Sequence, residues 1–343
     1  MKELYVCYAS SNEYAGYTGI SLLSLLTNNR DINFGEIFIL DYGIKEDNKD
    51  KLRGIASGFG QQVTFLNAGA VLEGLREELS LQDFSGSLAT YSRAFIGYIM
   101  PDYVRYLLYI DSDTVVCGSI QKILDMEMGV AVMAGAIGVN QYPYPNEKPN
   151  PELNLVSGNR MYVACGIVYY DLKNWREQDC SRMIADTCKL GLSFPLADQT
   201  LINNAIPECL LAALPPEFNY WGHCYRRHRE VRELKRGGWH SDETIAQLIA
   251  NPVIIHFKGL FFRPWFDGCI SRKKEEYAKY KAMSPWKDVP QETLKAQIAK
   301  QSRRQRFHLR FGLAYELAPY QWLADAVLSV KRAITAIQKL LRH

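Results

Sequence analysis

The chain contains no pair of cysteines in the Cys-x-x-Cys spacing of zinc sites and redox motifs. Its eight cysteines are scattered over 343 residues, which argues against a disulfide frame or structural zinc and favours reduced thiols. No apolar run reaches the roughly 18 residues of a transmembrane helix. The first ten residues, MKELYVCYAS, lack the basic region, apolar stretch and cleavage site of a secretion signal. We therefore expect a cytoplasmic protein without a membrane span.

What the chain does have is a large apolar fraction and an uneven charge. Hydrophobic residues make up 48% of the sequence, enough at this length to bury a large core. The net charge is +3, yet residues 291–343 hold ten Lys or Arg against three Asp or Glu, so the remainder is acidic overall. This asymmetry predicts an anionic partner for the tail alone. We place the domain boundary at residue 285, which gives one domain over 1–285 and a basic tail over 286–343.

Segments with the pattern of strands alternate with helix-like segments through most of the chain. The alternation predicts a parallel α/β sheet with helices on both faces. In such sheets ligands bind beyond the carboxyl ends of the strands, so YASSNEY (8–14) is expected to form a ligand loop. The expected strands cover 4–9, 36–41, 61–66, 105–111, 161–172 and 252–257, and one expected helix covers 88–102.

The tail has an apolar stripe of its own. Basic residues lie beside this stripe, and KQSRRQRFHLRF (300–311) precedes it. The pattern is typical of a helix that lies on an anionic membrane surface. A helix packed on the domain's own surface, or a dimer contact, is the alternative. The stripe has a spacing of three and four residues, as in one face of a helix, and consists of Leu323, Val327, Val330, Ile334, Ile337 and Leu341.

Two aspartates, Asp111 and Asp113, follow the apolar segment RYLLYI directly. Residues two apart in a strand point to the same side, so both carboxylates can share one Mg²⁺ or Mn²⁺. Buried without a cation, the two charges would repel each other. The alternative is a pair of exposed acids in a turn. Their place at the ligand edge of the expected sheet favours the metal site.

The same residues, DSDTV, also fit the haloacid-dehalogenase-like phosphatases. Those enzymes carry D-x-D-x-[TV] after an apolar strand, and the first Asp is the nucleophile. Their motif usually opens the fold, whereas here it follows about three strand–helix units. The acidic motif G-D-x-x-x-D that they need downstream is absent from this sequence. A phosphatase is therefore the weaker interpretation.

Six segments occur in a characteristic order along residues 3–270. They are YASSNEYAGY, TYSRAFIGYIMP, YLLYIDSDTVV, CGIVYYDLKNWR, ADQTLIN and HFKGLFFRPW. In this order they resemble glycosyltransferase family 8, whose retaining enzymes include bacterial galactosyl- and glucosyltransferases of surface polysaccharides. The resemblance implies a GT-A fold, in which helices flank a Rossmann-like mixed sheet. It also implies a UDP-hexose donor and Mn²⁺ or Mg²⁺ as cofactor.

When the family's residue roles are carried over by position, the resemblance implies that Asp111, Asp113 and His256 are the metal ligands. His256 ends the apolar strand PVII, so it can reach the same sheet edge as the aspartates. Without the other motifs, a hydrogen-bonded core histidine would be the better interpretation. Arg263 lies in a segment that is expected to form a loop closing over the donor. Its positive charge can bind a phosphate of the donor there. Donor contacts are expected from Ala9, Ser10, Ser11, Asn12, Tyr14, Arg93, Asp111, Ser112, Gly166, Asp198, His256, Gly259 and Arg263.

Asp198 and Gln199 are the expected catalytic residues, because the resemblance places them beside the donor hexose. A retaining glycosidase would use a second carboxylate as its nucleophile, and an amide such as Gln199 is a poor one. We therefore favour a front-face mechanism, in which Gln199 stabilises developing positive charge and the departing phosphate oxygen takes the acceptor's proton. The alternative for this segment is an Asp that caps a helix beside a solvated Gln.

Three departures from the family pattern stand out. Ser10 and Ser11 replace an acid that commonly follows the first strand, and one extra residue separates Gly259 from Arg263. Ala164 stands where the family has an Asn that would contact the donor sugar, which puts the identity of the hexose in doubt.

We expect a hexosyltransferase that moves galactose or glucose to a saccharide or glycolipid acceptor in lipopolysaccharide, capsule or surface-glycan synthesis. Acceptor contacts are expected from residues 140–160 and 215–240. The tail would bind an anionic membrane surface, and no nucleic-acid partner is expected. A catalytically silent nucleotide-sugar binding protein is the alternative, favoured by Ala164 alone.

Overall fold

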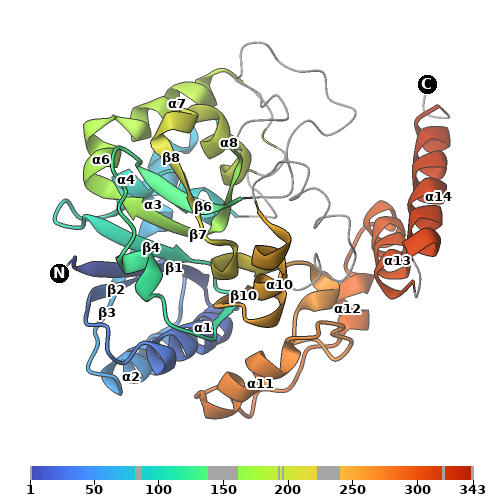
Figure 1. The fold of residues 1–343 in the computed structure, drawn as a ribbon, viewed down its shortest axis with the longest axis horizontal. Coiled ribbons are helices and arrows are strands. Elements are labelled where there is room, and N and C mark those ends of the chain that lie inside the picture. Colours follow the sequence, from blue (N-terminus) through green and yellow to red (C-terminus); the bar gives the residue numbers. More distant parts are fainter. Residues whose placement is uncertain are drawn as a thin grey trace.

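The computed structural model describes residues 2–81, 87–137, 161–191, 194, 197–221, 240–318 and 321–340. The described residues form a seven-stranded sheet in the order β3-β2-β1-β4-β7-β6-β8, with helices on both faces (Figure 1). Its strands are β1 (Leu4–Ser11), β2 (Phe34–Tyr42), β3 (Val63–Leu66), β4 (Tyr106–Ile110), β6 (Met133–Ile137), β7 (Val163–Asp171) and β8 (Leu211–Leu214).

The sheet is mixed because one strand runs against its neighbours. β7 pairs antiparallel with both β4 and β6, whereas the pairs β3–β2, β2–β1, β1–β4 and β6–β8 are parallel. β4 and β7 occupy the middle of the sheet, and nearly every residue of both is buried. Continuous apolar runs are what strands covered on both faces require. The mixed sheet implied by the family resemblance is confirmed, whereas the parallel sheet expected from the alternation alone is wrong at β7.

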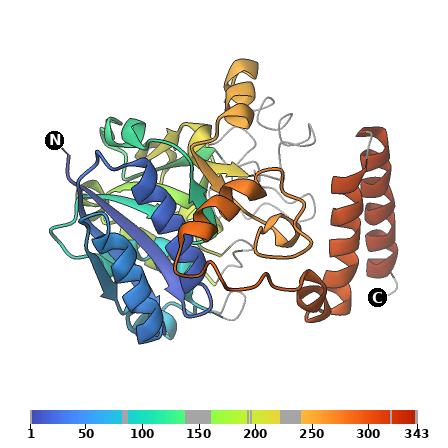
Figure 2. The same ribbon diagram turned by 90° about the horizontal axis from the view of Figure 1, so that it is seen from below.

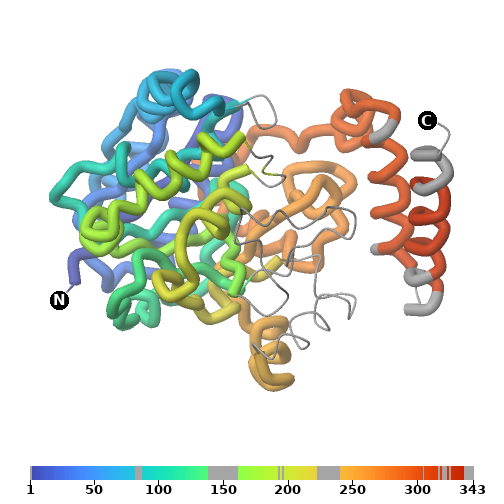
Figure 3. The backbone as a smooth tube through the Cα atoms, turned by 90° about the horizontal axis from the view of Figure 1, so that it is seen from above, coloured from blue at the N-terminus to red at the C-terminus, as the bar shows by residue number. Residues whose placement is uncertain are grey.

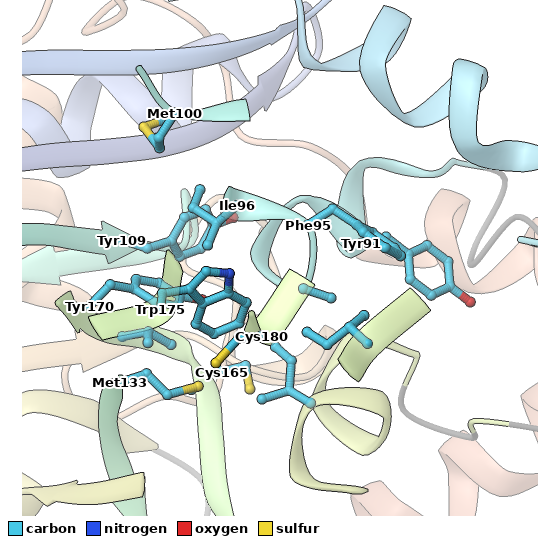
Figure 4. Close-up of a cluster of buried hydrophobic side chains, with 14 of the residues drawn as sticks. Tyr91, Phe95, Ile96, Met100, Tyr109, Met133, Cys165, Tyr170, Trp175 and Cys180 are labelled. Atoms are coloured by element: carbon cyan, nitrogen blue, oxygen red, sulfur yellow. The ribbon is translucent and has the colours of Figure 1, made fainter. Parts of the chain in front are cut away.

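The helices divide between the two faces of the sheet. Helices α1 and α2 pack on one face, where Leu22 and Leu25 belong to the buried cluster. Helices α3, α4, α6, α7 and α8 cover the other face around Trp175 and Tyr170 (Figure 4). These helices are α1 (Ala15–Asn28), α2 (Glu46–Ser57), α3 (Ala68–Arg76), α4 (Ile96–Ile99), α6 (Leu172–Glu177), α7 (Cys180–Lys189) and α8 (Asp198–Ala205), and α5 (Gln121–Leu124) follows β5.

The single helix expected over 88–102 is wrong. The segment forms a 3₁₀ helix, η1 (Ala89–Arg93), followed by the short α4. Phe95 leaves helical geometry between them, with φ −101° and ψ 22°. Gly97 then packs so tightly that a β-carbon there would lie 2.6 Å from Nε1 of Trp175. Tertiary packing has overridden local helix propensity here.

A second, three-stranded sheet lies beside the first and contains the strand expected at 252–257. Its order is β5-β10-β9, so this strand belongs to a separate small sheet rather than to the core sheet. β10 pairs antiparallel with β5, which places His256 opposite Thr114. It pairs in parallel with β9, which places His256 beside Trp221. The strands are β5 (Thr114–Val116), β9 (Tyr220–Trp221) and β10 (Ile254–His256), with 3₁₀ helices η2 (Glu208–Leu210), η3 (Pro216–Asn219) and η5 (Leu260–Phe262) nearby.

Beyond the small sheet, the chain returns to helix α1. Trp286 is buried against it, and a β-carbon at Gly19 would lie 2.2 Å from the indole ring. The hydroxyl of Tyr17 donates to Glu292. The domain boundary at residue 285 stays a prediction, and contacts with α1 continue beyond it. The helices of this part are α10 (Asp242–Ala250), α11 (Lys274–Met283) and α12 (Leu294–Ala299).

The last two described helices, α13 (Arg303–Leu317) and α14 (Gln321–Leu340), pack against each other. Figures 2 and 3 show this pair as a hairpin that stands apart from the sheet. Part of the predicted apolar stripe is covered. Leu323, Val327 and Ile334 are half-buried, while Val330 is 50% exposed. In the described part of the chain, no helix is both long and apolar enough to span a bilayer.

Candidate active site

Three predicted metal ligands meet where the two sheets adjoin. Asp111 follows β4, Asp113 precedes β5, and His256 ends β10. One ligand atom from each lies within 4.8 Å of the others. His256 Nε2 is 3.0 Å from Asp113 Oδ1 and 3.7 Å from Asp111 Oδ2. The pairing of β10 with β5 explains this approach, since the backbone N–H of Phe257 donates to the carbonyl of Asp113 at 2.8 Å.

The residues at this point fit a hard divalent cation. Two carboxylates and an imidazole nitrogen are oxygen and nitrogen ligands that Mn²⁺ and Mg²⁺ accept. Burial raises the pKa of Asp113, but His256, Arg263 and Lys258 hold it below its ordinary value overall. The carboxylate is therefore ionised, as a metal ligand must be.

Gly166 leaves the space that His256 and Asp111 occupy, because it has no side chain. The residue lies in β7, and its carbonyl accepts a hydrogen bond from the backbone N–H of Asp111 at 2.8 Å. A β-carbon at position 166 would lie 2.4 Å from His256 Cε1 and 2.9 Å from Asp111 Oδ2. The sequence argument assigned Gly166 to donor binding, and the structure places it directly against two predicted metal ligands.

Arg93 joins the predicted metal site to the predicted sugar site. Its Nη1 donates to both carboxylate oxygens of Asp111, at 2.9 and 3.0 Å. Its Nε forms an ion pair with Asp198 Oδ2 at 2.7 Å. The guanidinium also lies over the ring of Tyr109, 5.5 Å from its centroid. A surface salt bridge, the simplest alternative for Arg93, does not describe this residue, whose side chain is 12% exposed.

Asp198 and Gln199 begin helix α8. Ala197 occupies the N-cap with φ 46°, a conformation that non-glycine residues rarely adopt, so Asp198 is not the capping residue. Burial raises the pKa of Asp198 to about 7, although Arg93 lowers it. Gln199 Oε1 accepts from the backbone N–H of Cys165, and its Nε2 donates to Tyr162 Oη, both at 3.2 Å. The catalytic roles of Asp198 and Gln199 stay predictions.

The segment predicted to form the nucleotide loop, 8–14, includes the end of β1, because that strand continues to Ser11. It borders a cleft of about 540 Å³ that Arg93 and Asp111 also line. Ser112 Oγ donates to the carbonyl of Ala9 at 2.9 Å, and Thr18 Oγ1 lies 2.8 Å from the hydroxyls of both Ser10 and Ser112. This hydroxyl network fixes the end of β1 to the turn between β4 and β5 that carries the aspartates. The residues lining the cleft include Ala9, Ser10, Ser11, Tyr14, Arg93, Asp111, Ser112, Asp113 and Arg263.

Asn12 is a partial exception among the loop residues. Its Oδ1 accepts from the backbone N–H of Lys45 and from Asn48 Nδ2, each at 3.0 Å. It lines a neighbouring cavity of about 290 Å³ rather than the cleft with the aspartates. Its predicted contact with the donor stays a prediction.

The expected phosphate loop closes the other side of the cleft. Gly259 has φ +88° and starts the 3₁₀ helix η5, a conformation that favours glycine. Arg263 Nη2 lies 3.6 Å from Asp113 Oδ2, and its guanidinium lies over the ring of Trp265. The Nε of Arg263 is buried without a hydrogen bond. This cation therefore already faces the predicted metal site.

Sequence reasoning missed several residues of the site. Thr18 lies inside α1, and Asn219 contacts His256 from the end of η3. Tyr162 holds the Gln199 amide. No local pattern marks any of them, because each acts through a contact with a distant segment. The expected acceptor segments 140–160 and 215–240 lie largely outside the described residues, which exclude 138–160 and 222–239.

Comparison with known proteins agrees with this geometry. A model of Glycosyl transferase family 8 matches residues 5–269. General stress protein A of Bacillus subtilis (strain 168) is 24% identical over 290 residues, which cover 83% of this chain and 96% of that protein. The lipopolysaccharide 1,2-glucosyltransferase of Escherichia coli (strain K12) is 25% identical over 296 residues, covering 83% and 79% respectively.

Two solved structures share the fold. The galactosyltransferase LgtC, in complex with donor and acceptor sugar analogs, superposes with a TM-score of 0.63 at 19% identity and covers 82% of this chain and 96% of that one. The WbbM bifunctional glycosyltransferase superposes with a TM-score of 0.67 at 19% identity, covering 83% and 50%. The predicted GT-A-type fold is confirmed. With the family match extending over most of the chain, the protein is an enzyme that belongs to glycosyltransferase family 8.

Proposed function

We propose that this enzyme transfers galactose or glucose from a UDP-sugar to a saccharide or glycolipid acceptor, with retention at the anomeric carbon. One observation carries the proposal. Asp111, Asp113 and His256 converge beside a cleft that the segment 8–14, at the end of β1, and Arg263 also border. This is the arrangement that a nucleotide diphosphate with a divalent cation requires.

The proposed cofactor is Mn²⁺ or Mg²⁺, held by the two aspartates and His256. When bound, such a cation neutralises charge on the diphosphate leaving group as the bond to the sugar breaks. Arg263 would add hydrogen bonds to a phosphate oxygen. Ser10 and the backbone of Ala9 would hold the nucleoside, since Thr18 and Ser112 fix their positions.

We propose a front-face reaction for the sugar transfer. Asp198 would accept hydrogen bonds from hexose hydroxyls, and Arg93 would keep that carboxylate in place. The Gln199 carbonyl would face the positive charge that develops at the anomeric carbon. Because Cys165 N–H and Tyr162 Oη hold both ends of this amide, Gln199 is oriented before the donor binds, which lowers the cost of the transition state.

The class of acceptor is proposed from a named relative, and the location in the cell is proposed from the basic tail. The curated relative named a lipopolysaccharide 1,2-glucosyltransferase supports a place in lipopolysaccharide, capsule or other surface-glycan synthesis. We propose a cytoplasmic enzyme bound peripherally to an anionic membrane through the hairpin of α13 and α14. The exposed Arg303 and Arg310 on α13 suit this contact.

A panel of UDP-sugars tests the proposal. The purified full-length protein is incubated with each sugar nucleotide and Mn²⁺, and UDP release is measured with and without EDTA. We expect metal-dependent release from UDP-galactose or UDP-glucose. Binding of UDP without release from any sugar would instead support a catalytically silent binding protein. That alternative is favoured by Ala164, which is a buried residue of β7 in place of the family's Asn.

A further inference from the structure

We propose that the cavity of about 290 Å³ beside the catalytic cleft is a second saccharide site, which holds one neutral sugar ring. Its walls come from the start of α1, from α11 and from the segment around Trp286. The cavity adjoins the cleft with the aspartates, since Glu13 lines both. That the sugar is a unit of the acceptor glycan rests on the proposed function, whereas the binding site itself does not.

Two deeply buried aromatic side chains bring unpaired polar atoms to this cavity. Tyr277 is 4% exposed and Trp265 is 5% exposed, and both line the cavity. Among the described residues, neither the Tyr277 hydroxyl nor the Trp265 indole N–H has a hydrogen-bond partner. Buried tyrosine and tryptophan usually have such a partner. Neither atom belongs to the fully enclosed unpaired atoms of the described chain, so a ligand in the cavity can reach both.

The polar groups around the cavity carry no net charge. Lys51 and Lys281 balance Glu13 and Glu292, so the lining favours neither a phosphate nor a free cation. Asn48 adds an amide. Ammonium groups and amide nitrogens donate hydrogen bonds, while carboxylate and amide oxygens accept them. A mixture of donors and acceptors without net charge suits the hydroxyl groups of a neutral sugar.

The arrangement of the rings disfavours a planar nucleobase. Trp265 stacks on Tyr17, with the ring centroids 4.2 Å apart and the planes at 22°. Trp286 packs so closely on α1 that a β-carbon at Gly19 would lie 2.2 Å from it, and Lys51 Nζ lies over its ring. The large rings are therefore already covered and offer no pair of open faces for stacking. The C–H groups of a sugar can pack on the remaining apolar surface while its hydroxyls reach the polar groups.

The cavity has the size and the access that one sugar ring needs. Its volume equals that of about ten water molecules and lies at the lower end of the range for ligand pockets. Val289 lines the cavity and is 52% exposed, so a ligand can enter from the solvent on this side. A glycan chain can therefore place one unit in the cavity while the rest of it stays outside.

Hydrogen bonds hold the walls of the cavity in place without a ligand. The indole N–H of Trp286 donates to Asn48 Oδ1 at 3.2 Å. The Tyr17 hydroxyl and Gln297 Nε2 both donate to the carboxylate of Glu292. The lining is thus largely preformed, which reduces the entropy that a bound sugar must offset.

The test reads sugar binding at individual tryptophans of the full-length protein, without metal or sugar nucleotide. The six tryptophans are labelled with fluorotryptophan, and each ¹⁹F signal is assigned by its loss in a Trp→Phe variant. Methyl β-glucoside and methyl β-galactoside are the probes. We expect the Trp286 signal to shift saturably, with a dissociation constant on the order of 1 mM for a ligand of this size. Trp175, in the buried cluster on the other face of the sheet, should not respond.

Two variants and their controls locate the binding site. Tyr277→Phe removes only an unpaired hydroxyl, so the fold should be kept while affinity falls about 3- to 10-fold, the effect of one hydrogen bond. Its control is Tyr280→Phe on the same helix, because the Tyr280 hydroxyl is bonded by Asn28 instead. Val289→Phe obstructs the entrance and should weaken binding by about 10-fold or more.

The control for Val289→Phe is Val130→Phe, at a position that is 69% exposed and does not line the cavity. It should leave the affinity unchanged. The inference is overturned if neither glycoside shifts the Trp286 signal well above the expected dissociation constant. A response confined to Trp221, beside the predicted metal site, would overturn it as well. So would an unchanged affinity in Tyr277→Phe or Val289→Phe; if Tyr277→Phe does not fold, Val289→Phe decides. A saturable Trp286 shift in a protein that releases UDP from no UDP-sugar would count against the proposed function alone.

Discussion

Gly166 and His256 approach so closely that the glycine cannot be replaced without moving the imidazole. A β-carbon at position 166 would lie 2.4 Å from Cε1 and 2.8 Å from Nδ1 of the ring. The backbone of β7 therefore forms one wall of the predicted metal site. Because Gly166 also accepts the N–H of Asp111, the strand cannot simply retreat to make room.

Gly166→Ala should therefore disable the enzyme while leaving most of the fold intact. A displacement of His256 by about 1 Å would cost on the order of 10²-fold in sugar transfer, with a parallel loss of Mn²⁺ affinity. Gly54→Ala in α2 is the matched control, because a β-carbon there meets no atom within 4 Å. It should keep full activity and add about 0.4–1 kcal/mol of stability. Comparable activity of both variants would show that the close approach has no functional consequence.

Asp198 should make the stability of the metal-free protein depend on pH. Burial raises the pKa of its carboxyl from 3.8 to about 7. Between these values the folded state holds a proton that the unfolded chain has released, so the free energy of unfolding falls as pH rises. The stability of the wild type relative to Asp198→Asn should accordingly decrease from about pH 4 to about pH 7.

Urea denaturation at several pH values measures this difference. Asp186→Asn, at a helix position that is 62% exposed, controls for the loss of one negative charge. A relative stability that stays constant or rises over the same range would contradict the raised pKa of Asp198.

Trp286 should contribute strongly to stability even though it lies just beyond the predicted boundary at residue 285. It packs on Gly16 and Gly19 of α1, and its indole N–H donates to Asn48 Oδ1 at 3.2 Å. Trp286→Ala should lower the free energy of unfolding by about 3–5 kcal/mol, the usual cost of removing a buried aromatic side chain. A cost below about 1 kcal/mol, typical of a surface residue, would show that this segment is dispensable.

Charge reversal on α13 should weaken membrane binding if the hairpin is the anchor. The double variant Arg303→Glu with Arg310→Glu changes two exposed side chains, so folding should be preserved. Sedimentation with vesicles that contain anionic lipid should fall well below that of the wild type, because each basic residue near such a surface contributes about 1 kcal/mol. The Arg53→Glu variant, at an exposed position of α2, is the control. Equal sedimentation of the wild type and the double variant would rule out this surface as the anchor.

Much of the site could be predicted because its residues follow apolar strands. Asp111 follows the apolar strand β4 of the main sheet, where ligands bind beyond the carboxyl ends of the strands. His256 also ends an apolar strand, but β10 belongs to the small sheet, so its approach to the aspartates depends on the pairing of β10 with β5. The contact of Asn219 with His256 could not be predicted, since it depends on the pairing of β9 with β10, whose partners Trp221 and His256 lie 35 residues apart in the sequence. The helix expected over 88–102 was wrong because Arg93 and Gly97 take positions set by Asp111 and Trp175.

The most direct test of the account is Mn²⁺ binding by the full-length wild type and by Asp113→Asn, both with UDP present. Electron paramagnetic resonance follows the loss of the free Mn²⁺ signal, while circular dichroism and thermal unfolding check the fold. We expect the wild type to bind one Mn²⁺ per chain and Asp113→Asn to bind it at least about 10²-fold more weakly, since a charged ligand is lost. Equal affinity of the two proteins for Mn²⁺ would contradict the assignment of Asp111, Asp113 and His256 as the metal site.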